Sequence, residues 1–365
     1  MRTLIMIINQ LRNSGPNRVM LDIAANIDRA KIRPVVISLM PDDTVRPIAH
    51  KFKEIGVEIY RFNYNFYSLE LNTFNVAKRL EKFIVENYDN PVVQAHGYHP
   101  TLLTARMHIP HTVTIHCISK EDFIKSRGPI IGNYMVYRFA RNLKKQKYPV
   151  VISSYMANYY RNICKNNIQL IYNGVSYSPL QSDISQLKQK LAISPNKKII
   201  IVTGGLNERK NNIHTILQLK QSGLDNFLCV FLGIGPQEQF LKDSVGNDNR
   251  FRFDGYRTNI NEYLAIADLY VSSSLSEGLP LAVLEAVCSG VPCLLSNIPP
   301  HKEIVEKIDC QGVDTFSIST NELAENLSFF LNHKWSRRNI SERARNVFSS
   351  KKMGAQYTEL VENIR

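Results

Sequence analysis

Short apolar runs alternate along the chain with segments of helical spacing. In the first half, the runs Thr3–Ile8 and Pro34–Leu39 predict buried strands. Between them Val19, Ile23 and Ile27 recur at helical intervals. Strands that alternate with helices are typical of a parallel sheet with helices on both faces. Ligands of such sheets bind beyond the carboxyl ends of the strands, so we expect functional residues in the loops that follow them.

The alternation restarts once. Further strands are predicted at Val57–Phe62, Val92–Ala95, Thr112–Ile115, Val150–Ser153, Lys198–Thr203, Phe227–Leu232, Phe251–Phe253, Asp268–Val271 and Pro292–Ser296, and helices at Asn75–Glu86, Asn261–Ala267, Glu322–Leu331, Glu342–Phe348 and Met353–Ile364. The stretch Ser176–Ser182, rich in Ser and Pro, is expected to link the two halves. A chain of 365 residues is long enough for two domains with separate cores.

The stretch Ser272–Gly290 reads as a strand end, an acidic turn and a helix. Gly278 permits the turn, and Pro280 suits the first position of a helix, where its missing N–H costs nothing. The N–H groups of Leu281 and Ala282 would then lie at the helix N-terminus. They could hold a phosphate, helped by a helix dipole of about half a positive charge.

Two carboxylates flank this predicted anion site. Glu277 lies in the turn and Glu285 lies inside the helix. An acidic side chain beside a bound phosphate is useful when it accepts hydrogen bonds from neutral hydroxyl groups. A nucleotide sugar supplies both a diphosphate and hydroxyl groups. The structural alternative is an ordinary surface helix with an acid near its first turn.

A second loop offers cations for a diphosphate. Gly204 follows the predicted strand Lys198–Thr203, and Arg209 and Lys210 come shortly after it. Glycines after a strand, followed by adjacent cations, suit diphosphate binding. A solvated turn is the alternative. In the first half, Gly15 follows the first strand and would let backbone approach a ligand closely. The three-glycine dinucleotide pattern is absent there.

Charge distinguishes the two halves. Residues 1–178 carry 24 Lys and Arg against 12 Asp and Glu, so they hold +12 of the formal net charge of +13. This surplus favours an anionic partner. Its basic residues are not interleaved with an aromatic single-strand-binding motif, so no nucleic acid is expected. An anionic membrane surface or a lipid-diphosphate substrate fits the charge.

The basic segment Lys120–Lys147 mixes cations with apolar side chains. Its members include Lys125, Arg127, Arg138, Arg141, Lys144 and Lys145, with Phe123, Ile130, Ile131, Tyr134, Met135, Tyr137 and Phe139 between them. Part of it predicts an amphipathic basic helix, which could dock on a membrane. A solvated helix face over an apolar core contact is the alternative.

Other chemistry is not indicated. The six cysteines are scattered without a Cys-x-x-Cys pair or a His cluster, so we expect reduced thiols and no metal site. The apolar start Met1–Ile8 is too short for a signal peptide, and no run reaches the length of a membrane span. We expect a cytoplasmic protein, with peripheral contact at the inner face of the cell membrane left open.

The motif around the two carboxylates resembles a known family. Glu277 and Glu285 lie in the motif Ser-x-x-Ser-Glu-Gly-Leu-Pro-Leu-x-x-Leu-Glu-Ala-x-x-x-Gly-x-Pro. This motif is similar to the signature of retaining glycosyltransferases of family four. We expect a member that acts in bacterial surface-polysaccharide assembly. The resemblance implies the GT-B fold, in which two Rossmann-like α/β domains face each other across a cleft. We expect an acceptor-side domain at 1–178, a donor-binding domain at 179–351, and a C-terminal helix, about 352–365, that crosses back to the first.

The resemblance also implies roles for residues. Arg209 and Lys210 would neutralise the donor diphosphate, Glu277 would hold the transferred sugar and Glu285 the ribose. His116, after the strand Thr112–Ile115, would lie beside the transferred sugar. The remaining donor-binding candidates are Gly15, Gly204, Tyr256, Arg257, Gly278, Leu279, Leu281 and Ala282. Residues 297–303 resemble a family loop, and Asp254–Arg257 resembles the loop that receives the nucleobase.

The chain departs from the family pattern in the cation loop. Gly205 stands where the family has Arg, and Asn211 stands where it has a second Gly. Lys210 keeps its register, and Arg209 is expected to supply the missing cation. Two alternatives therefore stay open: a GT-B nucleotide-sugar epimerase, and a basic membrane- or nucleic-acid-binding protein with an inactive donor site.

We therefore predict that the protein is a retaining hexosyl- or N-acetylhexosaminyltransferase. It would use a nucleotide sugar, a UDP-sugar before a GDP-sugar, without a metal or other cofactor. The acceptor would be a glycan or a lipid-diphosphate-linked saccharide, and the context bacterial surface-polysaccharide assembly, including lipopolysaccharide or capsule.

Overall fold

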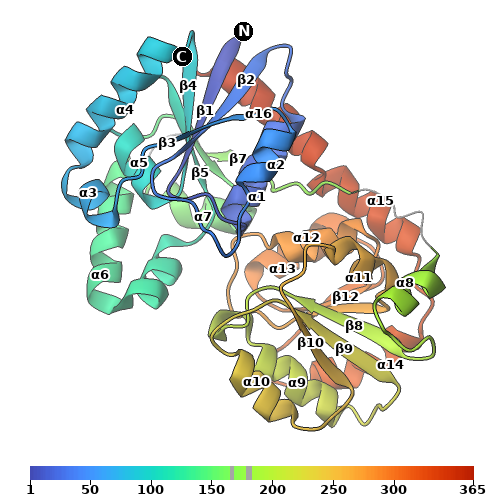
Figure 1. The fold of residues 1–365 in the computed structure, drawn as a ribbon. Coiled ribbons are helices and arrows are strands. Elements are labelled where there is room, and N and C mark those ends of the chain that lie inside the picture. The colour runs from blue at the N-terminus through green and yellow to red at the C-terminus, as the bar shows by residue number, and fades with distance from the viewer. Residues whose placement is uncertain (165–167, 178–182) are drawn as a thin grey trace. The chain divides into compact units, whose positions relative to one another are not determined.

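The computed structural model describes residues 1–164, 168–177 and 183–365 (Figure 1). Most of the predicted linker, residues 178–182, lies outside the described residues. The chain divides into two compact units. Unit 1 contains Met1–Gly174 and Ser350–Arg365, and unit 2 contains Val175–Ser349.

The described residues of unit 1 form a seven-stranded parallel sheet in the order β3-β2-β1-β4-β5-β6-β7. Its elements are β1 (Arg2–Ile8), α1 (Gly15–Asn26), β2 (Ile32–Ser38), α2 (Ala49–Glu54), β3 (Glu58–Arg61), α3 (Phe66–Leu71), α4 (Thr73–Asn87), β4 (Pro91–His96), α5 (Tyr98–Thr104), β5 (His111–Ile115), α6 (Ser119–Leu143), β6 (Pro149–Val151), α7 (Ser154–Arg161), β7 (Gln169–Leu170) and α16 (Ser350–Asn363). The central strand β1 is buried on both faces, which explains its continuous apolar run.

The described residues of unit 2 form a six-stranded parallel sheet in the order β10-β9-β8-β11-β12-β13. Its elements are α8 (Ile184–Lys190), β8 (Lys198–Thr203), the 3-10 turn η1 (Glu208–Lys210), α9 (Asn212–Gln221), β9 (Phe227–Leu232), α10 (Glu238–Val245), β10 (Phe251–Gly255), α11 (Ile260–Ile266), β11 (Leu269–Ser272), α12 (Leu281–Cys288), β12 (Cys293–Ser296), α13 (Pro299–Ile308), β13 (Val313–Phe316), α14 (Glu322–Asn332) and α15 (Arg337–Phe348). The prediction of two Rossmann-like α/β sheets is confirmed.

Each sheet buries an apolar core against the helices that cover it. In unit 2, Ile200 of β8 and Phe231 of β9 pack with Leu327 of α14 in one fully buried cluster. In unit 1, Ile5 of β1 packs with Leu80 of α4 in another. Burying one such side chain contributes about 1.5–3 kcal/mol. Among the described residues no helix is both long enough and apolar enough to cross a membrane.

The C-terminal helix α16 belongs to unit 1, as the resemblance predicted. It packs against α1, and Arg2 at the start of β1 donates hydrogen bonds to the carbonyl oxygens of Val361 (2.5 Å) and Ile364 (2.7 Å). The Tyr357 hydroxyl lies 3.0 Å from Thr114 Oγ1 on β5. The two ends of the chain therefore meet in one unit (Figure 1).

Three local predictions need correction. Gly15 does not lie in a loop before the first helix; it is the first residue of α1. Pro280 is the residue before α12, which begins at Leu281. The segment 297–303 is not a loop, because α13 begins at Pro299, where the fixed φ of proline favours a helix start.

Gly354 tests how closely α16 is packed. A Cβ atom at this position would lie 2.4 Å from the carbonyl oxygen of Asn26 in α1. Gly→Ala in a helix normally stabilises by up to about 1 kcal/mol, but this contact reverses the sign. We predict that Gly354→Ala lowers the free energy of unfolding by about 1–3 kcal/mol in urea denaturation. Lys351→Ala on the exposed side of α16 is the control, and an unchanged or more stable Gly354→Ala protein would contradict the packing.

Candidate functional site

The strand order of unit 2 reverses at one point. The chain moves outward from β8 to β9 and β10, and then returns to place β11 on the other side of β8. The loops that follow β8 and β11 therefore leave their strands in opposite directions. A crevice forms at such a switch point, beyond the carboxyl ends of the strands. The two loops that the sequence marked for a donor, 204–211 and 273–280, are the loops at this point.

A buried carboxylate joins these two loops. Glu277 Oε2 lies 2.5 Å from Arg209 Nη1, and Glu277 Oε1 lies 2.7 Å from Lys210 Nζ. The side chains of Glu277 and Lys210 are only 8% and 13% exposed, whereas that of Arg209 is 40% exposed. Ser274 Oγ donates a third hydrogen bond to Glu277 Oε1 at 3.0 Å. The predicted catalytic residues of this unit are thus brought into contact.

Backbone hydrogen bonds hold the same two loops together. The N–H of Leu275 donates to the carbonyl oxygen of Arg209 at 2.8 Å, and Arg209 Nη1 donates to the carbonyl oxygen of Ser276 at 3.0 Å. Arg209 is therefore tied to the acidic turn by its main chain as well as by its charge.

The cations hold the carboxylate in its ionised form. Burial by itself favours the neutral acid, but the charges of Lys210 and Arg209 outweigh it and lower the pKa of Glu277 from 4.5 to about 2. Glu277 is therefore a charged hydrogen-bond acceptor at neutral pH.

The sequence of the cation loop explains its shape. Gly204 adopts φ +127°, a backbone conformation that residues with a side chain rarely take, and a Cβ atom there would lie 2.9 Å from Lys210 Cε. Asn207 Oδ1 accepts from the N–H of Lys210 and starts the turn η1. Asn211 ends the turn in the left-handed region, at φ 50°. Asparagine tolerates that region better than most residues, so it can stand where the family has glycine.

The helix after the acidic turn presents its N-terminus at the switch point. Bonding within α12 begins with Val283 and Leu284, whose N–H groups both donate to the carbonyl oxygen of Pro280 at 3.1 Å. Leu281 and Ala282 precede these first intrahelical donors, as expected for the first residues of a helix. Glu285 lies one turn further along α12 and is half-buried.

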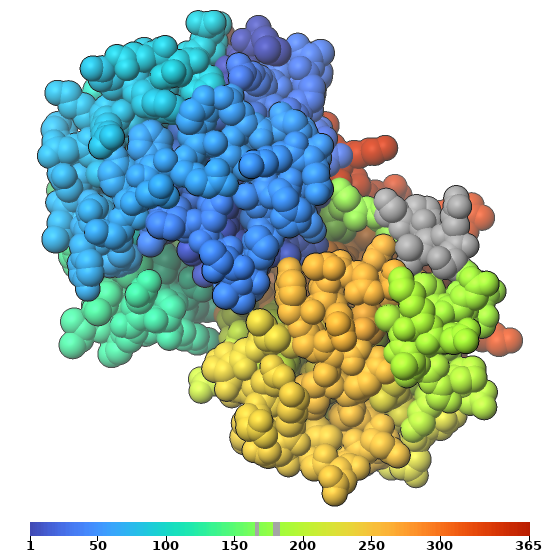
Figure 2. All heavy atoms as spheres, in the orientation of Figure 1, coloured from blue at the N-terminus to red at the C-terminus, as the bar shows by residue number. Residues whose placement is uncertain are grey.

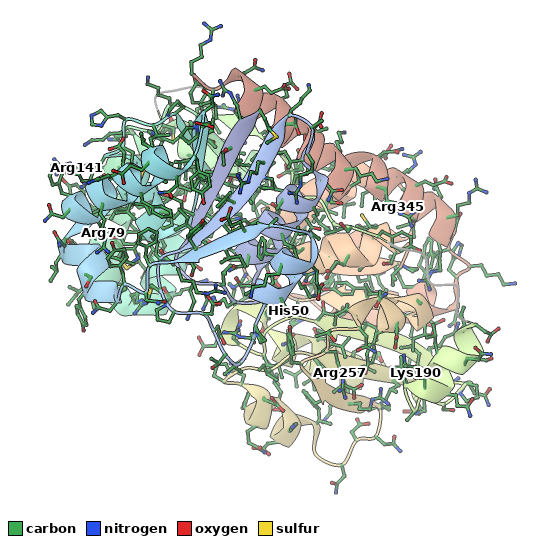
Figure 3. All side chains as sticks on the ribbon, turned by 45° about the horizontal axis from the view of Figure 1, so that its top comes forward. His50, Arg79, Arg141, Lys190, Arg257 and Arg345 are labelled. Atoms are coloured by element: carbon green, nitrogen blue, oxygen red, sulfur yellow. The ribbon has the colours of Figure 1, made fainter. Side chains whose placement is uncertain are left out.

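The remaining candidates of unit 2 lie in neighbouring loops. Tyr256 and Arg257 follow β10 and are exposed, and Figure 3 labels Arg257. Gly278 and Leu279 lie between Glu277 and the start of α12, with Leu279 buried.

The candidates of unit 1 lie at the carboxyl ends of its central strands. Gly15 has a negative φ, so its backbone does not require glycine, and among the described residues no atom lies within 4 Å of the place a Cβ would take. His116 follows β5. Its Nε2 lies 2.9 Å from His96 Nδ1 and the two rings stack at 5.2 Å. Burial lowers the pKa of His116 to about 4 and holds the pKa of His96 well below its ordinary value, so both are neutral at pH 7.

Sequence reasoning gave no role to three residues that adjoin the site. Ser274 binds Glu277, as described above. Ser296 Oγ, at the end of β12, donates to the carbonyl oxygen of Ser274 at 2.6 Å. His301 on α13 contacts Ser296 and is fully buried. The sequence feature that could have identified them is their position at the end of, or shortly after, the buried strands β11 and β12.

Among the described residues, no group of three or more His, Cys, Asp and Glu side chains could hold a metal ion. Arg209, Lys210 and Glu277 bring charges together at the switch point. With this arrangement the two cations can bind an anionic group, and Glu277 can accept hydrogen bonds from a neighbouring group.

Two family models match the chain, one in each half. Residues 183–347 match the model described as glycosyl transferases group 1, and residues 13–178 match the model described as glycosyltransferase family 4. Together they cover nearly the whole chain. The chain belongs to the group 1 glycosyltransferases.

Relatives and solved structures agree with this assignment. N-acetyl-alpha-D-glucosaminyl L-malate synthase of Bacillus anthracis is 25% identical over 337 residues, 86% of this chain and 84% of that protein. UDP-Gal:alpha-D-GlcNAc-diphosphoundecaprenol alpha-1,3-galactosyltransferase of Escherichia coli is 31% identical over 167 residues, 43% of this chain and 42% of that protein. The structure of HepE from Anabaena in complex with UDP-glucose has the same fold, with a TM-score of 0.81, 18% identity, and coverage of 99% of this chain and 100% of that one.

The buried charge cluster makes stability depend on pH in a defined way. Because the folded-state pKa of Glu277 lies below its ordinary value of 4.5, its stabilising effect is complete above about pH 4.5 and is lost as the pH falls toward 2. Glu277→Gln leaves Lys210 buried without its counter-charge. We predict a loss of about 3 kcal/mol in the free energy of unfolding at pH 7.

The difference between the wild-type protein and Glu277→Gln should shrink as the pH falls below about 4.5, since the unfolded wild-type chain then takes up a proton at Glu277 that the folded protein does not. Urea denaturation at several pH values measures it. The exposed Glu306→Gln is the matched control. A difference that stays constant from pH 7 to pH 3 would rule out the ionised cluster.

Proposed function

We propose that this protein transfers a hexosyl or N-acetylhexosaminyl group from a nucleotide-diphosphate sugar to a glycan or lipid-diphosphate-linked saccharide, with retention of anomeric configuration. The context is bacterial surface-polysaccharide assembly. The observation that carries the proposal is the contact of Arg209 and Lys210 with the buried Glu277, at the switch point of the unit 2 sheet.

The charges at this point suit a diphosphate. Arg209 and Lys210 place two positive charges beside Glu277, and both cations can contact an anion. A diphosphate would be held by both cations and by the N–H groups of Leu281 and Ala282 at the start of α12. The same contacts would stabilise the charge that develops on the leaving diphosphate.

The two carboxylates would divide the hydroxyl groups of the donor. Glu285 would accept hydrogen bonds from the ribose, and Glu277 would accept them from the transferred sugar and orient its anomeric carbon. Because Lys210 and Arg209 keep Glu277 ionised, it would accept rather than donate. Gly204, Gly278 and Leu279 would border the donor, with Tyr256 and Arg257 near its base.

Unit 1 would supply the acceptor side. His116 would form a hydrogen bond with the transferred sugar, and its neutral imidazole suits that role better than that of a charged acid. Gly15 would leave space for the donor diphosphate, because nothing lies within 4 Å of its missing Cβ among the described residues. No metal and no other cofactor would be required.

The relatives favour a UDP-sugar and a lipid-linked acceptor. The name of the Escherichia coli relative specifies UDP-galactose and a diphosphoundecaprenol acceptor, and HepE was crystallised with UDP-glucose. The names of both curated relatives specify α-linked products. An α-linked product from an α-linked nucleotide sugar corresponds to retention.

A donor and acceptor screen tests the proposal. Thermal shift with UDP- and GDP-sugars identifies the donor, and product analysis on an undecaprenyl-diphosphate-linked saccharide follows. We expect acceptor-dependent transfer and, by NMR, an anomeric configuration equal to that of the donor. Product formation without an acceptor would instead support an epimerase, and no nucleotide binding would support a protein with an inactive donor site.

Substitution of the two carboxylates should separate the two ends of the donor. We predict that Glu285→Gln weakens binding of UDP and of the UDP-sugar about equally, by roughly tenfold, because the ribose is common to both. Glu277→Gln should leave UDP binding intact or tighter, since it removes a negative charge from the diphosphate site. It should also remove the extra affinity that the sugar provides.

Isothermal titration calorimetry with both ligands measures this split. Glu306→Gln, an exposed acid of α13, is the control for a lost carboxylate. Equal losses for UDP and the UDP-sugar in Glu277→Gln would show that Glu277 does not contact the sugar.

We further propose that unit 1 rests on the inner face of the cell membrane through α6. The α6 face consists of Ile130, Ile131, Tyr134 and Tyr137, which are 87%, 54%, 51% and 63% exposed. The exposed cations Lys125 and Arg127 precede the kink of α6 at Gly128, and the exposed cations Arg141 and Lys144 lie at the end of the helix. Other apolar residues of the helix, Phe123, Met135 and Phe139, are buried in the unit. Figure 2 shows the α6 residues, in teal, at the surface of unit 1. Exposed apolar and aromatic side chains beside cations suit an anionic lipid surface.

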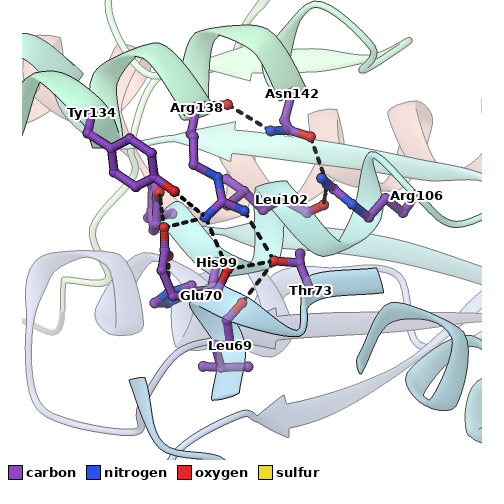
Figure 4. Close-up of polar contacts among 10 residues, drawn as sticks. Leu69, Glu70, Thr73, His99, Leu102, Arg106, Tyr134, Arg138 and Asn142 are labelled. Carbon is purple, nitrogen blue, oxygen red and sulfur yellow. Dashed lines mark hydrogen bonds and ion pairs between the residues drawn. The ribbon is translucent and has the colours of Figure 1, made fainter. Parts of the chain in front are cut away.

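A partly buried polar network connects α6 with α3 (Figure 4). Arg138 of α6 forms an ion pair and hydrogen bonds with Glu70 of α3, and also donates to Thr73 Oγ1 at 3.2 Å. Glu70 also accepts from Tyr98 at 3.1 Å and lies 3.1 Å from His99 Nε2, both on α5. Next to this network α3 exposes Tyr67 and Leu71, which are 73% and 83% exposed. The network would hold the α6 face and these two side chains in one orientation toward a lipid surface.

The membrane contact can be tested with vesicles. We predict that Ile130→Ser with Ile131→Ser reduces co-sedimentation with phosphatidylglycerol vesicles at least about tenfold, because two exposed apolar side chains are removed. Wild-type binding should fall with salt and be weak on phosphatidylcholine. Leu217→Ser, at a residue of unit 2 that is 56% exposed, is the control. Equal binding of the double variant and the wild type would contradict docking through α6.

A further inference from the structure

A buried histidine with an unused nitrogen lies next to the Glu277 cluster. His301 has no exposed surface, and it occupies the first turn of α13, just beyond the carboxyl end of β12. Its Nδ1 lies 2.9 Å from the carbonyl oxygen of Ser296 and 3.1 Å from Ser296 Oγ. Neither the family motif nor the roles assigned above make use of this residue.

The hydrogen bonds around Nδ1 determine the tautomer. The carbonyl oxygen of Ser296 can only accept. The single proton of Ser296 Oγ is already donated to the carbonyl oxygen of Ser274, at 2.6 Å, so this oxygen also presents lone pairs to the ring. Nδ1 therefore carries the proton. Burial lowers the pKa of His301 to about 4, so the ring is neutral at pH 7 and Nε2 is a bare acceptor.

That acceptor has no hydrogen-bond partner among the described residues, although it is fully buried. An unpaired buried acceptor costs free energy, so it usually has a partner that a ligand or a water supplies. The charges of Glu277 and Lys210 both act on the His301 ring. The serine chain described above connects the same residues, since Ser274 binds Glu277 through its hydroxyl and Ser296 through its carbonyl oxygen.

We propose that His301 Nε2 accepts a hydrogen bond from a hydroxyl group of the transferred sugar, which makes His301 a second sugar-recognition residue beside Glu277. The inference rests on the proposed function, because it assumes a nucleotide sugar at this site. The two acceptors differ in character: Glu277 is charged and held by cations, whereas Nε2 is neutral and held by Ser296. Together they would select a sugar with two hydroxyl groups at the matching positions.

Two variants separate recognition from support. In His301→Asn the side-chain amide can still donate to Ser296, but no acceptor remains at the place of Nε2. In His301→Gln an amide oxygen can reach that place. Calorimetry would compare UDP with whichever of UDP-glucose, UDP-galactose and UDP-N-acetylglucosamine the wild type binds best.

We expect His301→Asn to bind the UDP-sugar about three- to tenfold more weakly and UDP unchanged, with part of the loss recovered in His301→Gln. Unchanged UDP affinity also shows that unit 2 is folded in the variant. An equal loss for both ligands in both variants would mean that His301 only supports the fold. No loss for either ligand would mean that Nε2 is satisfied by a buried water.

Deoxygenated donors give a second readout that needs no folding control. The wild type should lose affinity for the UDP-sugar that lacks the contacted hydroxyl group, and His301→Asn should then show no additional loss. Independent losses for every deoxygenated sugar would overturn the contact. The proposed function is judged separately, by whether the wild-type protein binds any of the nucleotide sugars.

Discussion

The site of this protein depends on keeping one carboxylate charged inside the fold. Removing Glu277 from water is costly unless cations and hydrogen bonds replace the solvent. Arg209, Lys210 and Ser274 do so, and they come from the loops that follow β8 and β11. The need to pair this charge therefore holds two loops together that lie far apart in the sequence. The loop with the two cations also needs the glycine at 204, because its φ of +127° would strain a residue with a side chain.

The paired charge also explains how one small site could recognise both parts of a nucleotide sugar. Arg209 and Lys210 would offer two cations to a diphosphate, while they keep the carboxylate ionised to accept from sugar hydroxyl groups. The network continues through Ser274 and Ser296 to His301, so hydrogen bonds from β12 and α13 also stabilise the turn that holds Glu277. The residues that depart from the family pattern in this loop are compatible with the same charge pairing. Arg209 contacts the same carboxylate as Lys210, and Asn211 adopts the left-handed backbone expected of the glycine it replaces.

Much of the fold could be predicted from sequence because its strands are buried and its helices amphipathic. The apolar runs at 198–203 and 227–232 match β8 and β9 in full. The start of α13 was not predicted, because the resemblance assigned residues 297–303 to a family loop, whereas Pro299 starts the helix. The sequence predicted that Glu277 and Lys210 bind the same ligand, but it did not predict their direct contact. That contact requires β11 to lie next to β8, and the hydrophobic pattern along the chain does not predict which strands are neighbours in the sheet. His301 was missed for a related reason, since its unpaired nitrogen is a property of the packed structure.

The central claim is that Arg209 and Lys210 form the binding site for the diphosphate of a nucleotide sugar. Titration calorimetry of UDP with the wild-type protein and with the Arg209→Ala, Lys210→Ala double variant tests it most directly, with Lys307→Ala as a control for the loss of an exposed cation of unit 2. The account predicts saturable binding to the wild type and to the control, and a loss of at least about a hundredfold in the double variant. Undiminished UDP binding by the double variant would contradict it.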